Sequence, residues 1–269
     1  MKILKWFPVL LFCSCIDMIT DFTFYNSLYF QGGSWIEIAP LDSMKMGDGS
    51  NDFTLQFWIS GSDEYANDGP AMFSLIDTQD TIKLALFRDS GKPNAINTIV
   101  NSVFIDTVIN EPTWELDWTN DDEFYLISIL FSDSLGIKGY INSTIFLDRN
   151  DLVKAGDAKL MIGTKANEER TILGNFWYGY MDEIRLWNTW LDDNTIQFQT
   201  EHPDKFGEYY RYTVDGEEVE TYLDSLIGLW RFNLSEATAT IADESSQVHD
   251  GIIYTLPNYS VELSEKGAQ

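Results

Sequence analysis

Cysteine is nearly absent from this sequence. The 269 residues contain only Cys13 and Cys15, and no cysteine follows them. A disulfide framework is therefore excluded for the rest of the chain, whose stability has to come from core packing, with or without a bound metal. Hydrophobic residues make up 44% of the chain and aromatic residues 14%, so the chain can bury a sizeable core as one large β domain or two small ones.

Positively charged residues are also few. Lysine and arginine together number 17 against 43 aspartates and glutamates, which gives a formal net charge of −26. A surface this acidic repels phosphate backbones and excludes nucleic acid as a partner. It attracts cations instead, or simply keeps the protein soluble in salty surroundings.

Helical periodicity is almost absent, and so are linkers rich in proline or glycine. Short runs with a period of two follow one another from Phe22 onward, and such runs are typical of β-strands. The first run is broken at Gly32-Gly33, which indicates two strands or one kinked strand. The expected strands lie within residues 27–38, 53–60, 82–87, 124–131, 136–141, 159–163, 180–187 and 228–232.

These elements predict an all-β fold, a two-sheet antiparallel β-sandwich with one short helix. The helix is expected within residues 191–199, capped by one of its two leading aspartates, Asp192 or Asp193. Asp215-Gly216 stands between alternating residues and predicts a hairpin. The nearly continuous apolar run from 124 to 131 is typical of a central strand covered on both faces.

We expect one domain at about 22–256 and a polar tail at 257–269. Outside the N-terminus, no apolar run is long enough to span a membrane.

The N-terminus differs from the rest of the chain. Lys2 and Lys5 precede an apolar run at 6–12, which is too short to span a bilayer and about right for a signal peptide. The run ends in Phe-Cys-Ser-Cys. This ending resembles the bacterial lipoprotein signal, in which a small residue precedes a cysteine that is lipidated and becomes the new N-terminus. Cys15, preceded by Ser14, matches that cysteine.

The lipoprotein resemblance implies a signal peptide at 1–15 and a short tether at 16–21. It also implies an exported protein of the cell envelope that faces the periplasm or the exterior, with the N-terminal lipid anchor as its only contact with a membrane. An ordinary secretory signal and an uncleaved anchor are the alternatives.

Four stretches, in this order, resemble the laminin-G-like branch of the concanavalin A-like jelly rolls found in bacterial secreted proteins. SLYFQGGSWIEI (27–38) resembles the opening strand pair of that family, and NDFTLQFWIS (51–60) resembles a following strand. GYMDEIRLWNTWLDDNTI (179–196) resembles the family's strand and helical turn, and residues 228–253 resemble its closing segment. The resemblance implies the jelly-roll fold.

Asp182 interrupts the pattern of its predicted strand. Strict alternation puts Tyr180, Ile184 and Leu186 on one face, which looks like the core side, and Asp182 falls within that row. An ionised carboxylate that faces a core costs several kcal/mol unless something pairs with it. The family resemblance implies one structural Ca²⁺ at this residue, with other carboxylates and backbone carbonyls as further ligands. The alternative is that Asp182 accepts backbone N–H bonds from a neighbouring loop.

Glu115 and Asp117 begin a pattern known from glycoside hydrolases that share this jelly roll. The enzymes that resemble laminarinases place three carboxylates on one strand, so that the outer two flank the scissile bond. In this chain Thr119 and Asn120 stand where the third carboxylate belongs. We therefore expect a protein that is not an enzyme, and a glycoside hydrolase is the alternative.

Aromatic residues at predicted loop positions indicate a binding function. A sugar site needs aromatic faces for stacking and a few polar groups. Trp114 and Trp118 frame the loop before the central strand, and Trp177 and Tyr178 precede the strand of Asp182. We expect a non-catalytic module that recognises a glycan or an envelope or extracellular protein. A purely structural or adhesive surface protein is the alternative.

Overall fold

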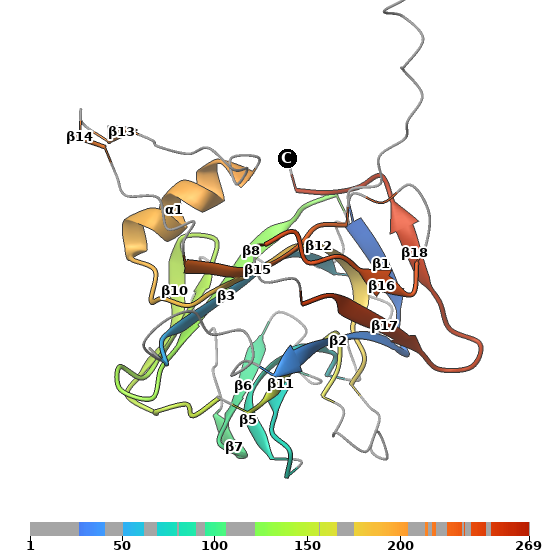
Figure 1. Ribbon diagram of the computed structural model, residues 1–269, viewed down its shortest axis with the longest axis horizontal. Coiled ribbons are helices and arrows are strands. Elements are labelled where there is room, and N and C mark those ends of the chain that lie inside the picture. Colours follow the sequence, from blue (N-terminus) through green and yellow to red (C-terminus); the bar gives the residue numbers. More distant parts are fainter. Residues whose placement is uncertain are drawn as a thin grey trace, which may run out of the picture.

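Two antiparallel β-sheets packed face to face form the body of the protein (Figure 1). The expected all-β sandwich with a short helix is confirmed. The computed structural model describes residues 27–40, 51–61, 69–79, 81–89, 95–105, 122–155, 157–165, 175–203, 213–214, 217–218, 225–232, 234, 238–245 and 249–268.

The first sheet, which we name sheet A, has eight strands. From one edge to the other, seven of them are β10 (Thr144–Arg149), β9 (Ile137–Ile141), β8 (Tyr125–Phe131), β3 (Phe53–Gly61), β12 (Tyr178–Trp187), β1 (Ser27–Gln31) and β18 (Val261–Ser264). The eighth strand, β15 (Leu226–Trp230), pairs with the second half of β12.

The second sheet, sheet B, also has eight strands. In spatial order they are β16 (Thr240–Ile241), β17 (Gly251–Thr255), β2 (Ser34–Pro40), β11 (Lys159–Ile162), β4 (Ala71–Ile76), β5 (Ile82–Arg88), β6 (Ile96–Val100) and β7 (Val103–Ile105). Two further strands, β13 (Thr213–Val214) and β14 (Glu217–Glu218), pair with each other, which confirms the predicted hairpin.

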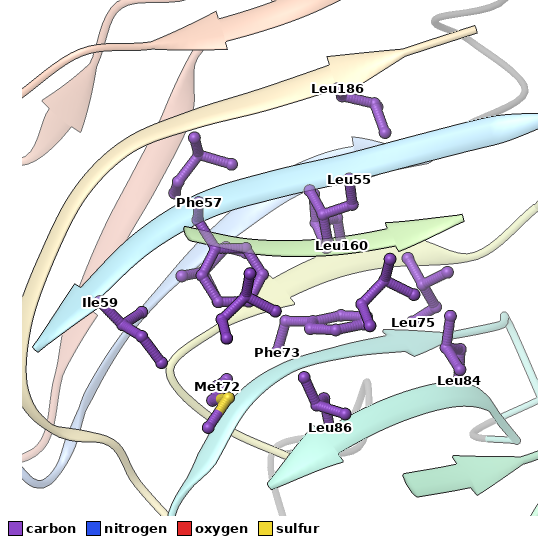
Figure 2. Close-up of a cluster of buried hydrophobic side chains, with 14 of the residues drawn as sticks. Leu55, Phe57, Ile59, Met72, Phe73, Leu75, Leu84, Leu86, Leu160 and Leu186 are labelled. Carbon is purple, nitrogen blue, oxygen red and sulfur yellow. The ribbon is translucent and has the colours of Figure 1, made fainter. Parts of the chain in front are cut away.

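The hydrophobic core lies between the inner faces of the two sheets. Leu55, Phe57 and Ile59 alternate along β3, and all three are completely buried. Figure 2 shows their side chains directed at Phe73 and Leu75 of β4 in the opposite sheet. Burying one such side chain contributes about 1.5–3 kcal/mol to stability. This packing is the physical reason for the period of two in the sequence, because the pleat sends every second residue to the same face.

In the described part of the chain one helix, α1 (Asp193–Glu201), covers part of the outer face of sheet A (Figure 1). Its N-cap is Asp192, whose carboxylate accepts a hydrogen bond from the backbone N–H of Thr195 at 2.8 Å. The helix expected within 191–199 is therefore confirmed. Ile196 joins an apolar cluster that the helix shares with the outer face, and the central strand β8 is buried along its whole length.

The break predicted at Gly32-Gly33 separates two strands. Gly32 and Gly33 separate β1 from β2 with φ angles of 74° and 119°, a backbone region that favours glycine. The segment predicted as a polar tail contains β18, which pairs with β1 at the edge of sheet A. The predicted domain boundary at residue 256 is therefore too early.

No helix in the described ranges has the length and apolarity needed to cross a membrane.

Candidate functional site

A β-bulge in β12 decides the direction of Asp182. The pairing of β12 with β3 shifts register between Asp182 and Ile184, and the intervening residue, Glu183, has a φ of 29°. Met181 and Ile184 consequently both face the core, where they are fully buried. Asp182 faces the outer side of sheet A. The prediction that it belongs to the core-facing row is therefore wrong, because the bulge inserts one residue into the alternation.

Two arginines hold the bulge in place. The Nε groups of Arg185 and Arg231 both donate to the Glu183 carboxylate, the second at 3.3 Å. Arg185 is almost completely buried, and its Nη2 donates to the carbonyl of Pro203 at 3.3 Å. These bonds connect the bulge to the segment at the end of α1, so the helix and the bulge stabilise each other.

Asp182 is half-buried although it faces outward. Its Oδ2 accepts a hydrogen bond from the backbone N–H of Ala268 at 3.1 Å, so a backbone donor partners the carboxylate, as in the alternative predicted from the sequence. Burial is the main cause that raises the pKa of Asp182, and the neighbouring Glu183 carboxylate adds to it, which brings this pKa from 3.8 to about 7.

The side chains described around Asp182 do not supply the carboxylates of a calcium site. Calcium takes six to eight oxygen ligands, usually with several carboxylates among them. Among the residues that the structure describes, no group of three or more acidic, histidine or cysteine side chains converges to hold a metal. The nearest carboxylate, Glu183, is paired with two arginines, and Asp182 accepts an N–H donor.

A pocket of about 540 Å³ lies on the outer face of sheet A next to Asp182. Trp58 of β3 contributes to its wall, and this residue is the register partner of Asp182 on β12. The rest of the wall comes from residues 122–124, which precede β8, and from residues 265–268, which follow β18. The volume lies within the range of small-ligand sites, about 300–1,000 Å³.

Aromatic rings extend from the pocket across the sheet. Phe124 of the pocket wall and Tyr180 of β12 have ring centroids 6.4 Å apart. Tyr180 lies against Tyr29, its register partner on β1, with centroids 4.6 Å apart, and Tyr178 meets Tyr29 edge-on at 5.7 Å. We name Trp58 and these four residues the aromatic row. It consists of four half-buried rings and the buried Trp58, on four neighbouring segments of one sheet face.

Charged side chains stand at the mouth of the pocket. Asp122, Glu123 and Glu265 are exposed, and Lys266 is partly buried. The Nζ of Lys266 lies 2.9 Å from Asp122 Oδ1 and 5.3 Å from the centroid of the Tyr180 ring. The pocket thus combines aromatic faces with carboxylates and one ammonium group.

The structure divides the four aromatic residues predicted as ligand-binding. The prediction that Trp177 binds a ligand is wrong, because its side chain has no exposed area and packs in the core. Tyr178 belongs to the aromatic row and is half-buried. Trp114 and Trp118 lie outside the described residues, as do Glu115 and Asp117 of the incomplete hydrolase pattern and the lipidation candidate Cys15.

The other members of the aromatic row were not recognised from the sequence. Tyr29, Trp58 and Tyr180 lie inside predicted strands, where an aromatic residue is more often part of the core. One indication was available for Trp58, which lies out of phase with the apolar residues Leu55 and Phe57 of its strand. That phase places Trp58 on the face opposite the core.

Comparison with known proteins identifies the fold and no family. No protein-family model matches the sequence, and no curated protein sequence matches it either. A candidate carbohydrate binding protein from Bacteroides ovatus superposes with a TM-score of 0.55 and 12% identity, over 90% of this chain and 60% of its own length. Trypanosoma rangeli sialidase in complex with sialic acid superposes with a TM-score of 0.51 and 15% identity, over 68% of this chain and 28% of its own length.

The chain spans less than two thirds of the length of either protein. Identities this low show the fold alone. The chain therefore has the fold of a two-sheet antiparallel β-sandwich. A fold of this kind does not define an activity, which depends on the pocket and the aromatic row.

Proposed function

We propose that this protein is a glycan-binding module of the laminin-G-like kind and that its site is the pocket beside the aromatic row. The observation that carries the proposal is a hollow of about 540 Å³ that is lined by Phe124, Trp58 and polar groups and that adjoins the half-buried rings of Tyr180 and Tyr29. Sugar rings present apolar C–H faces that stack on aromatic side chains, and their hydroxyl groups need nearby donors and acceptors. The carbohydrate-binding description of the Bacteroides ovatus protein supports the same function.

A glycan array followed by calorimetric titration of the bound glycans tests this function. We expect Phe124→Ala and Tyr180→Ala each to weaken glycan binding at least about tenfold, because the first removes a ring of the pocket wall and the second removes the ring that packs against it. Tyr254→Ala is the matched control. Tyr254 is also half-buried and stacks on Trp35 with centroids 5.4 Å apart, but it lies on sheet B, away from the pocket.

A blank array would refute the proposal, and so would equal losses for the pocket variants and the control. Capture of an envelope protein that depends on Phe124 and Tyr180, with no glycan bound, would establish the alternative of a protein-binding module. Thermal melting of each variant shows whether the fold is retained, so that a loss of binding is not confused with unfolding.

We further propose that the module binds without catalysis. The support is the sequence around Glu115, in which the third carboxylate of the hydrolase pattern is missing. Incubation with β-glucans is expected to release no reducing sugar. Release that disappears in Glu115→Gln would overturn the proposal in favour of a hydrolase.

Export and lipidation of Cys15 are likewise our proposal, supported by the N-terminal sequence. Metabolic labelling with a fatty acid is expected to mark the protein in the membrane fraction of a bacterial host, and Cys15→Ser is expected to abolish the label. An unlabelled secreted protein would favour the ordinary secretory signal.

A further inference from the structure

The charges at the pocket are unbalanced. Three exposed carboxylates, Asp122, Glu123 and Glu265, stand at its mouth with one ammonium group, that of Lys266. The chain as a whole carries a formal net charge of −26. Such a field concentrates cationic ligands at the pocket and repels anionic ones. Sugars that carry carboxylates or sulfates are therefore disfavoured.

Lys266 shows which chemistry the pocket accepts. Its ammonium group lies between a carboxylate, 2.9 Å away on Asp122, and the face of Tyr180, whose centroid is 5.3 Å away. Both distances are those of favourable contacts for a cation, an ion pair and a cation–π interaction. The segment that carries this lysine, residues 265–268, forms one side of the pocket. An ammonium group on a ligand would find the same two partners where this side chain now lies.

A neutral sugar uses only part of this arrangement. It stacks on the rings and forms hydrogen bonds with the carboxylates, but it makes no ion pair. A sugar with a free, protonated amine adds the ion pair and the cation–π contact to the same stacking. We propose that the pocket selects glycans that carry free amino groups, such as oligosaccharides of unacetylated glucosamine. The proposal rests on the glycan-binding function above and adds the class of sugar.

Calorimetric titration with three oligosaccharides of equal length tests the selection at slightly acidic pH, where the amines are protonated. We expect the glucosamine tetrasaccharide to bind about tenfold more tightly than the N-acetylglucosamine tetrasaccharide or cellotetraose. A factor of this size is the upper limit set by one exposed ion pair together with one cation–π contact, because the sugar amine has to displace the Lys266 ammonium group from the same two partners.

Substitutions at the pocket are compared with the same substitutions at a similar group elsewhere on sheet A. Lys138 lies 5.1 Å from the centroid of Tyr140 and 2.9 Å from Asp193, which repeats the arrangement outside the pocket. Asp122→Asn is expected to remove most of the preference for the amine, whereas Asp193→Asn leaves it intact. Lys266→Gln vacates the position and is expected to strengthen amine binding about threefold or more, while Lys138→Gln has little effect.

Equal affinity for the amine, acetylated and neutral sugars would refute the selection and leave the glycan-binding function standing. Failure of all sugars to bind would refute the function itself. Amine binding that responds equally to the pocket and control variants would indicate attraction by overall charge, which also overturns the proposal. A lysine oligopeptide that binds as tightly, with the same dependence on Asp122 and Lys266, would assign the pocket to protein ligands instead of glycans.

Discussion

The half-buried Asp182 and the buried Asp243 show two ways in which the fold accommodates an aspartate that is withdrawn from water. Asp243 accepts three backbone N–H bonds at 2.9 Å, from Leu229 and Ser245 to Oδ1 and from His249 to Oδ2. It joins the closing segment to β15 as an ordinary structural carboxylate. Asp182 has the backbone donor of Ala268, which lowers its pKa, but burial and the neighbouring Glu183 carboxylate outweigh this bond and raise the pKa to about 7.

The raised pKa of Asp182 makes stability depend on pH. The folded protein keeps the Asp182 proton up to about pH 7, whereas the unfolded chain releases it near 3.8. The free energy of unfolding therefore contains a contribution that is complete below pH 3.8, decreases as pH rises, and is lost above about 7. Asp182→Asn removes this dependence. As pH rises from 3.8 to about 7, the free energy of unfolding of the variant is expected to increase by on the order of 3 kcal/mol relative to that of the wild type.

Urea unfolding of wild type and Asp182→Asn across this pH range measures the difference. Asp148→Asn, at an exposed position on β10, serves as the control and is expected to follow the wild-type curve. Parallel curves for wild type and Asp182→Asn would mean that Asp182 is ionised in the folded protein throughout this range.

At the scale of the element, helix α1 is attached to sheet A by a buried polar network as well as by apolar contacts. The amide of Gln56 on β3 donates to Gln199 of the helix and, at 3.0 Å, to Ser128 of β8. Its carbonyl oxygen accepts the indole N–H of Trp187 at 2.8 Å. All four residues are buried, so loss of one partner leaves the others with fewer bonds in a site closed to water.

Gln199→Ala is expected to lower the free energy of unfolding by about 1–3 kcal/mol, because it removes the helix side of this network and leaves a cavity. Gln197→Ala, two positions earlier on the exposed side of the same helix, is the matched control and is expected to change stability by less than about 0.5 kcal/mol. Denaturant unfolding compares the two. Equal effects of the two substitutions would show that they act through helix propensity and not through the contact of α1 with sheet A.

For the whole molecule, the excess of negative charge is the dominant electrostatic feature. With 17 cationic against 43 acidic residues, repulsion outweighs attraction in the folded state. Raising NaCl from about 0.01 M to about 0.15 M shortens the Debye length from about 30 Å to about 8 Å and is expected to stabilise the protein by on the order of 1 kcal/mol. Urea midpoints at the two salt concentrations measure this effect.

Calcium and magnesium chlorides at matched ionic strength separate screening from specific binding. We expect equal midpoints in the two salts, since the residues described around Asp182 do not fit a calcium site. A larger effect of calcium that disappears in Asp182→Asn would show that such a site exists. A midpoint that falls as NaCl rises would mean that ion pairs outweigh repulsion.

Much of the fold could be predicted because its determinants are local. The alternation in residues 53–60 and the apolar run at 124–131 each predict a strand from neighbouring residues alone. Asp192 caps its helix through a hydrogen bond to a residue three positions away. The strands β4 and β6 went unrecognised. Their sequences, AMFSLI and INTIV, neither alternate strictly between apolar and polar residues nor form a long apolar run, so no period marks them as strands.

The candidate site could not be predicted in the same way, because its parts are distant in sequence. Strand pairing brings Trp58, residues 122–124 and residues 265–268 together, and no short pattern records that meeting. The bulge at Glu183 is similar. Its stability depends on Arg231 of another segment, and one inserted residue reverses the face on which Asp182 lies.

The sequence by itself determined the all-β class, the position of the helix, the acidic surface and the break between the first two strands, since each follows from periodicity, composition or contacts between near neighbours. Only the tertiary structure decided which face Asp182 occupies, that Trp177 is buried, and that the segment after residue 256 completes a sheet and walls a pocket. These features depend on strand register and on contacts between distant segments, which exist only once the two sheets have formed.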